Sequence, residues 1–279
     1  GTTLSAFWIL ALNSWMQTPT GHIVDGGQVI AGDWFQVVFN PSFPYRLTHM
    51  LLACGITTCF IVAGLSAWRL LRAPADTGAR RTLRAGLVAA AVLVPIQIVV
   101  GDLHGLNTLK HQPAKIAAME ALWETTRGAP LVLFAIPNEE RRRNDYAIEL
   151  PYGASLILGH EKRAEIKGLN DFEHRPPVTP VFWAFRIMVG IGVLMLAMVV
   201  ASWWLSWRDK LYDSQWYLPA CLAMGPLGFI AVLAGWTTTE VGRQPWTVYG
   251  LMRTGDSVPP SLSGSDVLIS LLGYMAVYL

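Results

Sequence analysis

Long apolar runs separated by short polar segments dominate the chain. Six of these runs are candidates for helices that cross a bilayer core, which takes roughly 20 apolar residues. They cover residues 3–16, 45–71, 83–100, 181–207, 217–238 and a stretch that begins near residue 266. The pattern predicts an all-α, polytopic transmembrane helical bundle of about six spans.

These spans divide the chain into three parts. Residues 1–103 hold transmembrane helices, residues 104–180 form one long loop, and residues 181–279 hold further transmembrane helices. Residues 26–39 are rich in large apolar side chains and carry few charges, which predicts a helix lying in the outer membrane interface. A loop as long as 104–180 is usually functional or disordered.

The basic residues predict the orientation of the bundle. Two short loops, at residues 72–82 and 208–216, are flanked by or contain Lys and Arg: Arg69, Arg72, Arg80, Arg81, Arg84, Arg208 and Lys210. By the positive-inside rule, both loops face the cytoplasm. The remaining connections, including the long loop, then face outward.

Composition agrees with a membrane protein. Of the 279 residues, 53% are hydrophobic and 14% are charged, whereas soluble domains carry about 25% charged residues. The mean hydropathy is +0.39. The net charge of +2 says little about partners, because charge in a membrane protein is distributed by side, and we expect no nucleic-acid partner. The chain begins with Gly1 and both ends lie in apolar runs, so we expect an internal piece of a longer polypeptide.

Cysteine and most histidine residues show no metal-site spacing. The three cysteines, Cys54, Cys59 and Cys221, lie in apolar runs and are predicted to be small core residues. Four histidines in the long outer segment are predicted to be surface residues: His104, His111, His160 and His174.

One histidine and one methionine stand out as a pair. His49 alone is typical of a histidine hydrogen-bonded between helices, and Met188 alone of packing. Both nevertheless lie in the outer half of the membrane on different spans, and His plus Met is an axial-ligand combination for an electron-transfer haem. Arg186 lies two residues before Met188 and needs an anionic partner, which a haem propionate would supply.

A second dense polar stretch follows the fifth span. Trp246 could anchor an interfacial turn here. Alternatively, Glu240, close to Trp236 and Arg243, could form a ligand and propionate clamp for a second metal centre. The residues alone leave both readings open.

A third group lies at the start of the long loop. Lys115, Glu120 and Glu124 favour a solvated amphipathic helix, with the two carboxylates on one face. The alternative is that Lys115 and Glu120 bind a quinol head group and take its protons.

Five ordered segments resemble subunit I of the cytochrome bd quinol oxidases. They are residues 1–19, similar to the family's fourth transmembrane helix, and residues 47–49, 101–125, 185–189 and 242–246. The resemblance spans essentially the whole chain. It is most specific in 101–125 and in the Gly-Arg-Gln-Pro-Trp sequence at 242–246.

The resemblance implies roles for residues of the outer half. His49 and Met188 match the axial ligands of the low-spin haem b, with Arg186 beside them. Lys115 and Glu120 match residues implicated in quinol oxidation on the outer loop.

Further roles follow for the second centre. Glu240 matches a carboxylate, an iron ligand, at the pair formed by the high-spin haem b and haem d, and Trp236 and Arg243 match neighbours of that pair. Ser5 matches a polar position near the proton path from the cytoplasm.

The implied reaction oxidises ubiquinol or menaquinol outside and reduces dioxygen to water, which charges the bacterial inner membrane without a pump step. The implied partners are a second large subunit and a small single-helix subunit.

Departures from the family limit what the resemblance implies. The family's first three helices, which hold a high-spin haem ligand and the acidic proton path, have no counterpart here, so the dioxygen site is half present. The loop at residues 104–180 lacks the extra insertion seen in some members of the family. The sequence fits a cyanide-insensitive branch of the same family equally well. Two competing hypotheses remain. One is a membrane transporter with Glu240 and Arg243 on its substrate path, and the other is a haem-free scaffold subunit.

Overall fold

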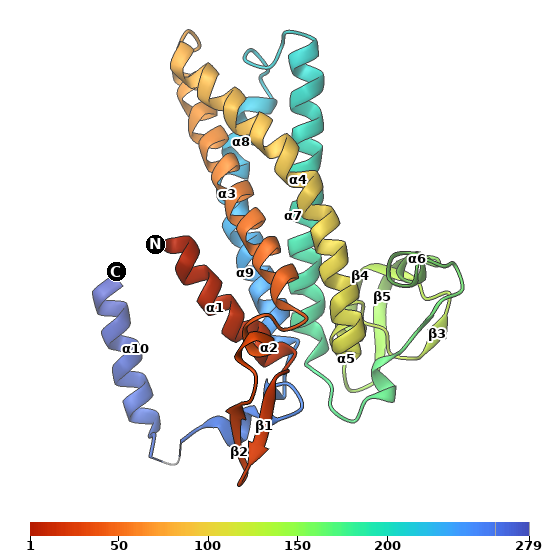
Figure 1. The fold of residues 1–279 in the computed structure, drawn as a ribbon. Coiled ribbons are helices and arrows are strands. Elements are labelled where there is room, and N and C mark those ends of the chain that lie inside the picture. Colours follow the sequence, from red (N-terminus) through yellow and green to blue (C-terminus); the bar gives the residue numbers. More distant parts are fainter. Residues whose placement is uncertain (260, 279) are drawn as a thin grey trace.

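Five helices form a long bundle in the computed structural model, which describes residues 1–259 and 261–278. They are α3 (Phe43–Arg72), α4 (Thr77–His111), α7 (Val178–Trp207), α8 (Tyr217–Met224) and α9 (Leu227–Val241). Figure 1 shows α3, α4 and α7 running the length of the bundle, with α8 and α9 following one another beside them. The predicted helical membrane bundle is confirmed.

The remaining elements are short and lie mostly at one end of the bundle (Figure 1). The helices are α1 (Thr2–Gln17), α2 (Trp34–Val38), α5 (Pro113–Met119), α6 (Gly153–Gly159) and α10 (Gly264–Tyr278), with 3-10 turns at Leu169–Asp171 and Thr254–Ser257. Four two-stranded antiparallel sheets pair β1 (His22–Asp25) with β2 (Gln28–Ala31), β3 (Thr126–Arg127) with β6 (Glu165–Ile166), β4 (Leu131–Asn138) with β5 (Arg143–Leu150), and β7 (Trp246–Val248) with β8 (Met252–Arg253).

Small residues let the bundle helices approach one another closely. A Cβ at Gly86 of α4 would lie 3.0 Å from the carbonyl oxygen of Cys59 on α3, and one at Gly64 of α3 would lie 3.0 Å from that of Cys221 on α8. Small interfacial residues are how membrane helices gain packing contacts in a medium as apolar as their own side chains. The core of the bundle contains buried residues of α3, α4, α7 and α8.

Local signals set the ends and breaks of these helices. Asp76 begins α4 by accepting a hydrogen bond from the Ala79 amide at 2.9 Å. α4 ends at His111 because Pro113 disfavours helical backbone at the residue before it. That residue, Gln112, adopts φ −140° and ψ 61°. Gly225 and Pro226 separate α8 from α9, which meet at an angle of 41°.

The prediction of about six spans was too high. Among the described residues, three helical segments, those containing α3, α4 and α7, are long and apolar enough to cross a membrane, and the bent α8–α9 pair makes a fourth if counted as one span. α1 has 16 residues and α10 has 15. α1 begins at Thr2 and α10 ends at Tyr278, so each is bounded by an end of the sequence, and neither is counted among the long helices.

Three finer predictions were also wrong. Residues 26–39 do not form one interfacial helix, since β2 and the five-residue α2 share this segment. Cys54 is exposed on α3 rather than a core residue, whereas Cys221 is buried. α4 also continues past residue 100 to His111, so His104 lies within a helix instead of on a loop surface.

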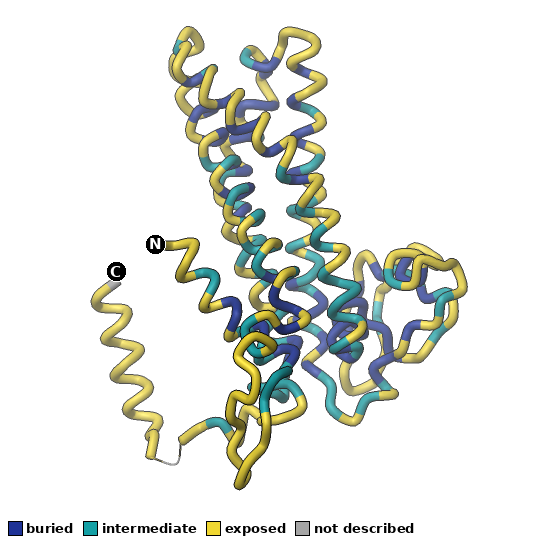
Figure 2. Tube along the Cα trace, in the orientation of Figure 1, coloured by how far each residue is buried: buried dark blue, intermediate teal, exposed yellow. Residues whose placement is uncertain are grey.

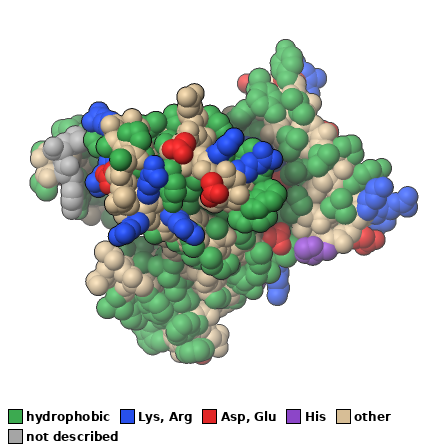
Figure 3. Space-filling model, turned by 90° about the horizontal axis from the view of Figure 1, so that it is seen from above, with side chains coloured by type: hydrophobic (Ala, Val, Ile, Leu, Met, Phe, Trp, Pro, Cys, Tyr) green, Lys and Arg blue, Asp and Glu red, His purple; other side chains and the backbone are tan. Residues whose placement is uncertain are grey.

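Exposure follows the expected membrane faces. Figure 2 shows exposed residues along the outward sides of the long helices and along all described residues of α10 up to Val277. Lys and Arg side chains gather at the end of the bundle that carries the α3–α4 and α7–α8 turns, as Figure 3 shows from above. The other end holds the long loop between α4 and α7, whose core is built from α5, β4 and the start of α7.

Candidate functional site

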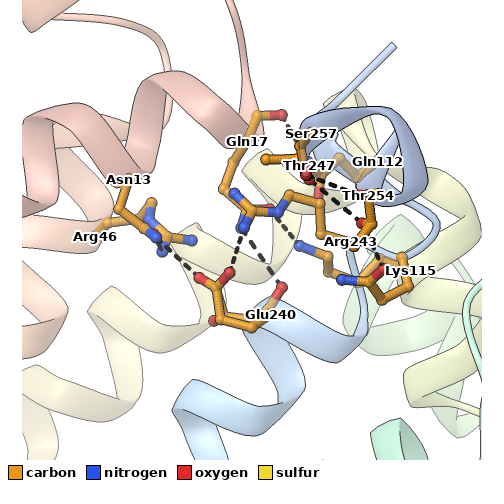
Figure 4. A network of polar contacts seen from close by, with 12 residues as sticks. Asn13, Gln17, Arg46, Gln112, Lys115, Glu240, Arg243, Thr247, Thr254 and Ser257 are labelled. Atoms are coloured by element: carbon orange, nitrogen blue, oxygen red, sulfur yellow. Dashed lines mark hydrogen bonds and ion pairs between the residues drawn. The ribbon is translucent and has the colours of Figure 1, made fainter. Parts of the chain in front are cut away.

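Polar side chains from four helical segments meet at the loop-bearing end of the bundle. Figure 4 shows Asn13 and Gln17 of α1, Arg46 of α3, Lys115 of α5 and Glu240 of α9 directed toward one another. Buried ionisable groups are costly in a membrane protein and mark functional sites by default.

Glu240 is the acidic centre of this cluster. Its Oε1 accepts a hydrogen bond from Asn13 Nδ2 at 2.9 Å, and its Oε2 accepts one from Arg243 Nη2. Arg46 Nη2 donates a hydrogen bond to Asn13 Oδ1. The Asn13 amide therefore links a second guanidinium, that of Arg46, to the Glu240 carboxylate. Burial lowers the pKa of Arg243 from its usual value, and the adjacent Glu240 opposes this shift.

The two arginines of the cluster have unused donors. The Nε of Arg46 and both the Nε and Nη1 of Arg243 are buried without a hydrogen-bond partner among the described residues. A buried, unpaired donor is expensive, and two guanidiniums beside one carboxylate leave an excess of positive charge. The cluster is therefore built to take up a further anionic group.

Lys115 is buried on α5, with 5% of its surface exposed. Its Nζ donates to Gln17 Oε1 at 2.6 Å. Burial lowers the pKa of Lys115 well below its usual value, the charges of Arg46 and Arg243 lower it further, and Glu240 opposes them. The reading of this segment as a solvated amphipathic helix was wrong, because α5 packs into the core between α7 and α4.

Glu120 is also buried, but its hydrogen-bond partner differs from that of Lys115. Its Oε2 accepts a hydrogen bond from Arg186 Nη2 at 2.7 Å, and Arg186 Nε donates to the carbonyl oxygen of Val132 at 2.7 Å. The guanidinium also lies 4.7 Å from the ring centre of Phe182. The anionic partner expected for Arg186 is thus, in this structure, the Glu120 carboxylate.

His49 faces α4 from α3. Its ring centre lies 5.6 Å from that of His104, and its Nε2 lies 3.4 Å from Gln97 Nε2. A Cβ at Gly101 would lie 3.3 Å from His49 Cε1, so only glycine allows this approach without displacement. The Nδ1 of His49 is buried without a partner among the described residues.

Met188 lies on α7 and contacts α9, where a Cβ at Gly235 would lie 2.8 Å from its sulfur. α3 and α7 each pack against both α4 and α9. The helices that carry His49 and Met188 therefore share α4 and α9 as packing partners. Trp236, one turn before Glu240, is exposed, and Ser5 is exposed on α1.

The residues around His49 and Met188 fit a planar, anionic cofactor such as haem. An unpartnered imidazole nitrogen and a thioether are suitable iron ligands. Gly105 and Gly192 lie one turn beyond Gly101 and Met188, and a Cβ at either would meet no atom within 4 Å. The unused guanidinium donors suit carboxylate groups on such a cofactor.

Sequence reasoning missed three residues that complete the cluster. Asn13, Gln17 and Arg46 are brought to Glu240 or Lys115 by the fold. The signal for Arg46 was its spacing of three residues from His49 on one helix, which places both on one face. Asn13 and Gln17 differ by four and share a face of α1 for the same reason.

Fold and site together define a class of protein: a polytopic membrane protein with a buried, cofactor-compatible polar site at one end of its bundle. Residues 1–279 match the family described as cytochrome bd terminal oxidase subunit I. The solved structure of the bd oxidase from Geobacillus thermodenitrificans is similar, with a TM-score of 0.88 and 33% identity over 99% of this chain and 65% of that chain.

Curated relatives agree. The cytochrome bd ubiquinol oxidase subunit 1 of Bacillus subtilis is 32% identical over 291 residues, covering all of this chain and 62% of the relative. The cytochrome bd-II ubiquinol oxidase subunit 1 of Escherichia coli is 28% identical over 348 residues, covering all of this chain and 68% of the relative.

The chain therefore belongs to the cytochrome bd terminal oxidase subunit I family. It spans 62% of the length of the Bacillus subtilis relative. The family assignment sets aside the transporter reading.

Proposed function

We propose that the chain is part of subunit I of a cytochrome bd-type quinol oxidase in a bacterial inner membrane. The complete enzyme oxidises ubiquinol or menaquinol at its outer face and reduces dioxygen to water. It contains a low-spin haem b, a high-spin haem b and haem d, and it assembles with a second large subunit and a small single-helix subunit. The family match over the whole chain supports this proposal.

The observation that carries the proposal is the buried His49 imidazole with its unpartnered Nδ1. His49 and Met188 would hold the low-spin haem b from α3 and α7. Haem, when bound, supplies a one-electron carrier between quinol and the dioxygen site. The lack of a side chain at Gly101 leaves space for the His49 ring, and the lack of one at Gly235 leaves space for the Met188 sulfur.

A second set of residues would serve the high-spin haem b and haem d pair. Glu240 offers a carboxylate at the end of α9, and Trp236 lies one turn before it. Arg243 and Arg46 have donors to spare for carboxylate groups. Ser5, on α1, belongs to the proposed proton route from the cytoplasm.

Lys115 and Glu120 would bind the quinol head group and accept its protons. Both are buried at the loop-bearing end, one with a neutral amide partner and the other with Arg186. A buried amine with a lowered pKa is unprotonated more readily and can accept a proton from a quinol hydroxyl. Protons taken up here leave on the outer side, so the reaction charges the membrane without a pump step.

A reduced-minus-oxidised spectrum of the complete oxidase in membranes tests the ligand assignment. We expect His49→Ala and Met188→Leu each to remove the low-spin haem b absorbance. His160→Ala, at an exposed loop position, is the matched control and should leave the spectrum unchanged. Survival of that absorbance in both variants would show that other residues ligate the haem.

A further inference from the structure

Gln17 ends α1 in the middle of the polar cluster. Only 2% of its surface is exposed. Its Oε1 accepts a hydrogen bond from Lys115 Nζ at 2.6 Å, its Nε2 donates to the carbonyl oxygen of Thr239 at 3.5 Å, and its own carbonyl oxygen accepts one from Gln112 Nε2 at 2.6 Å. One residue thereby joins α1 to α5, to the α4–α5 junction and to α9.

The Gln17 side chain is itself held in one orientation. Its amide nitrogen makes a long hydrogen bond, 3.5 Å, to the Thr239 carbonyl oxygen, and its amide oxygen makes a short one, 2.6 Å, to Lys115 Nζ. The bond from Gln112 holds the backbone at the same point. A rigid acceptor of this kind limits where the flexible four-carbon stem of a lysine can place its amine.

Lys115 depends on this acceptor. No described carboxylate lies within 4 Å of its amine, and Gln17 is its hydrogen-bond partner among the described residues. Its stem runs past Gly242, where a Cβ would lie 2.9 Å from Lys115 Cγ. The lack of a side chain at Gly242 thus leaves space for the Lys115 stem, and the hydrogen bond to Gln17 holds the amine in place.

A small cavity lies beside this contact. It is lined by polar groups from α1, α3, α4 and α5, among them Gln17, Arg46, His104, His111 and Lys115. Lys115 therefore borders an internal polar space. Losing Gln17 would let the amine turn into that space.

We propose that Gln17 is a positioning residue for quinol oxidation: it holds the Lys115 amine in the place where that amine meets the quinol head group. This inference rests on the proposed function. Gln17 suits the task because an amide oxygen accepts a hydrogen bond from an amine and from an ammonium alike, so the position of Lys115 is kept in both protonation states.

Three variants in the complete oxidase test the proposal. Gln17→Leu removes the acceptor at similar side-chain length, and Gln17→Glu keeps an acceptor oxygen at the same place. Gln36→Leu, at an exposed position on α2, is the matched control. Quinol-dependent dioxygen uptake gives kcat and KM, the reduced-minus-oxidised spectrum gives haem content, and uptake with a small soluble reductant measures electron flow that bypasses the quinol site.

We expect Gln17→Leu to lower kcat/KM for quinol by about tenfold or more, as the loss of a hydrogen bond to a charged or reacting group does. Haem content and reductant-driven uptake stay at the wild-type level, and Gln17→Glu recovers part of the quinol activity. A Gln17→Leu enzyme with wild-type quinol kinetics, or one that loses haem and both activities together, overturns the proposal. If the unaltered oxidase shows no quinol-dependent uptake, the proposed function itself fails.

Discussion

The buried Glu120–Arg186 pair gives a prediction whose size follows from the structure. The two side chains are 7% and 13% exposed, and the carboxylate and guanidinium meet at 2.7 Å. Glu120→Ala would leave the Arg186 charge buried and without its anionic partner. Arg186 cannot discharge, because a guanidinium stays protonated in proteins.

Removing one partner of a buried ion pair costs about 3–5 kcal/mol. Arg186 keeps two favourable contacts in the variant, the hydrogen bond to the Val132 carbonyl oxygen and the ring of Phe182. A partly desolvated cation–π contact contributes about 1 kcal/mol. We therefore expect Glu120→Ala to lower the free energy of unfolding by about 3 kcal/mol, the lower end of the range.

Two companion variants separate charge from packing. Glu120→Gln keeps a hydrogen-bond acceptor and should lose less stability than Glu120→Ala. The double variant Glu120→Leu/Arg186→Met replaces both charges by apolar side chains of similar volume, and such replacements are often neutral or stabilising. Thermal unfolding of the purified protein in detergent, followed by circular dichroism, measures all three.

In the double variant, stability should recover while quinol oxidation should not. Its unfolding temperature returns to near the wild-type value, while quinol oxidation stays low because the proposed proton acceptor is gone. If the double variant is as unstable as Glu120→Ala, the loss does not come from an unpaired Arg186 charge, and the reasoning is refuted.

Three further predictions follow from the described contacts. Gly235→Ala should push Met188 away from α9, since the new Cβ would lie 2.8 Å from its sulfur, and should shift the low-spin haem spectrum; an unchanged spectrum contradicts this. Lys115→Met should raise the unfolding temperature at pH 7. The gain should shrink toward pH 10.5, because the folded-state pKa lies below the unfolded value and the unmodified protein gains stability as pH rises through that window. Ala75→Cys should react with an impermeant maleimide only from the cytoplasmic side and Gly26→Cys only from the periplasmic side, over the background of the native cysteines; the reverse pattern would invert the orientation.

Hydropathy predicted two of the three long helices closely, whereas α4 (Thr77–His111) extends beyond the predicted run at both ends. The run predicted at residues 181–207 is a helix at Val178–Trp207, and the run at 45–71 is a helix at Phe43–Arg72. In the bilayer every backbone group must be satisfied within the segment, so apolar length and helix coincide. Hydropathy does not report a bend, and it missed the break at Gly225 and Pro226.

Long-range contacts were out of reach of the sequence pattern. Lys115 and Glu120 fall on a short segment whose helical pattern suggested a solvated face, yet both are buried against residues more than 60 positions away. Burial of α5 follows from packing against α7, which no local periodicity encodes. His49 was found because a histidine in an apolar run is conspicuous, and Glu240 because it lies in a dense polar stretch. Asn13 and Gln17 are single neutral amides at the end of an apolar run, and nothing in the local pattern shows that they meet Glu240 and Lys115.

The hydrogen bond between Asn13 and Glu240 joins positions 227 residues apart. A ribosome that adds roughly 5–20 residues per second needs about 10–45 s to synthesise the intervening chain. For that time α1 lacks the partner that satisfies the Asn13 amide. Assembly of the site is thus a late event in biogenesis, and a factor that delivers a cofactor to it must act after α9 has entered the membrane.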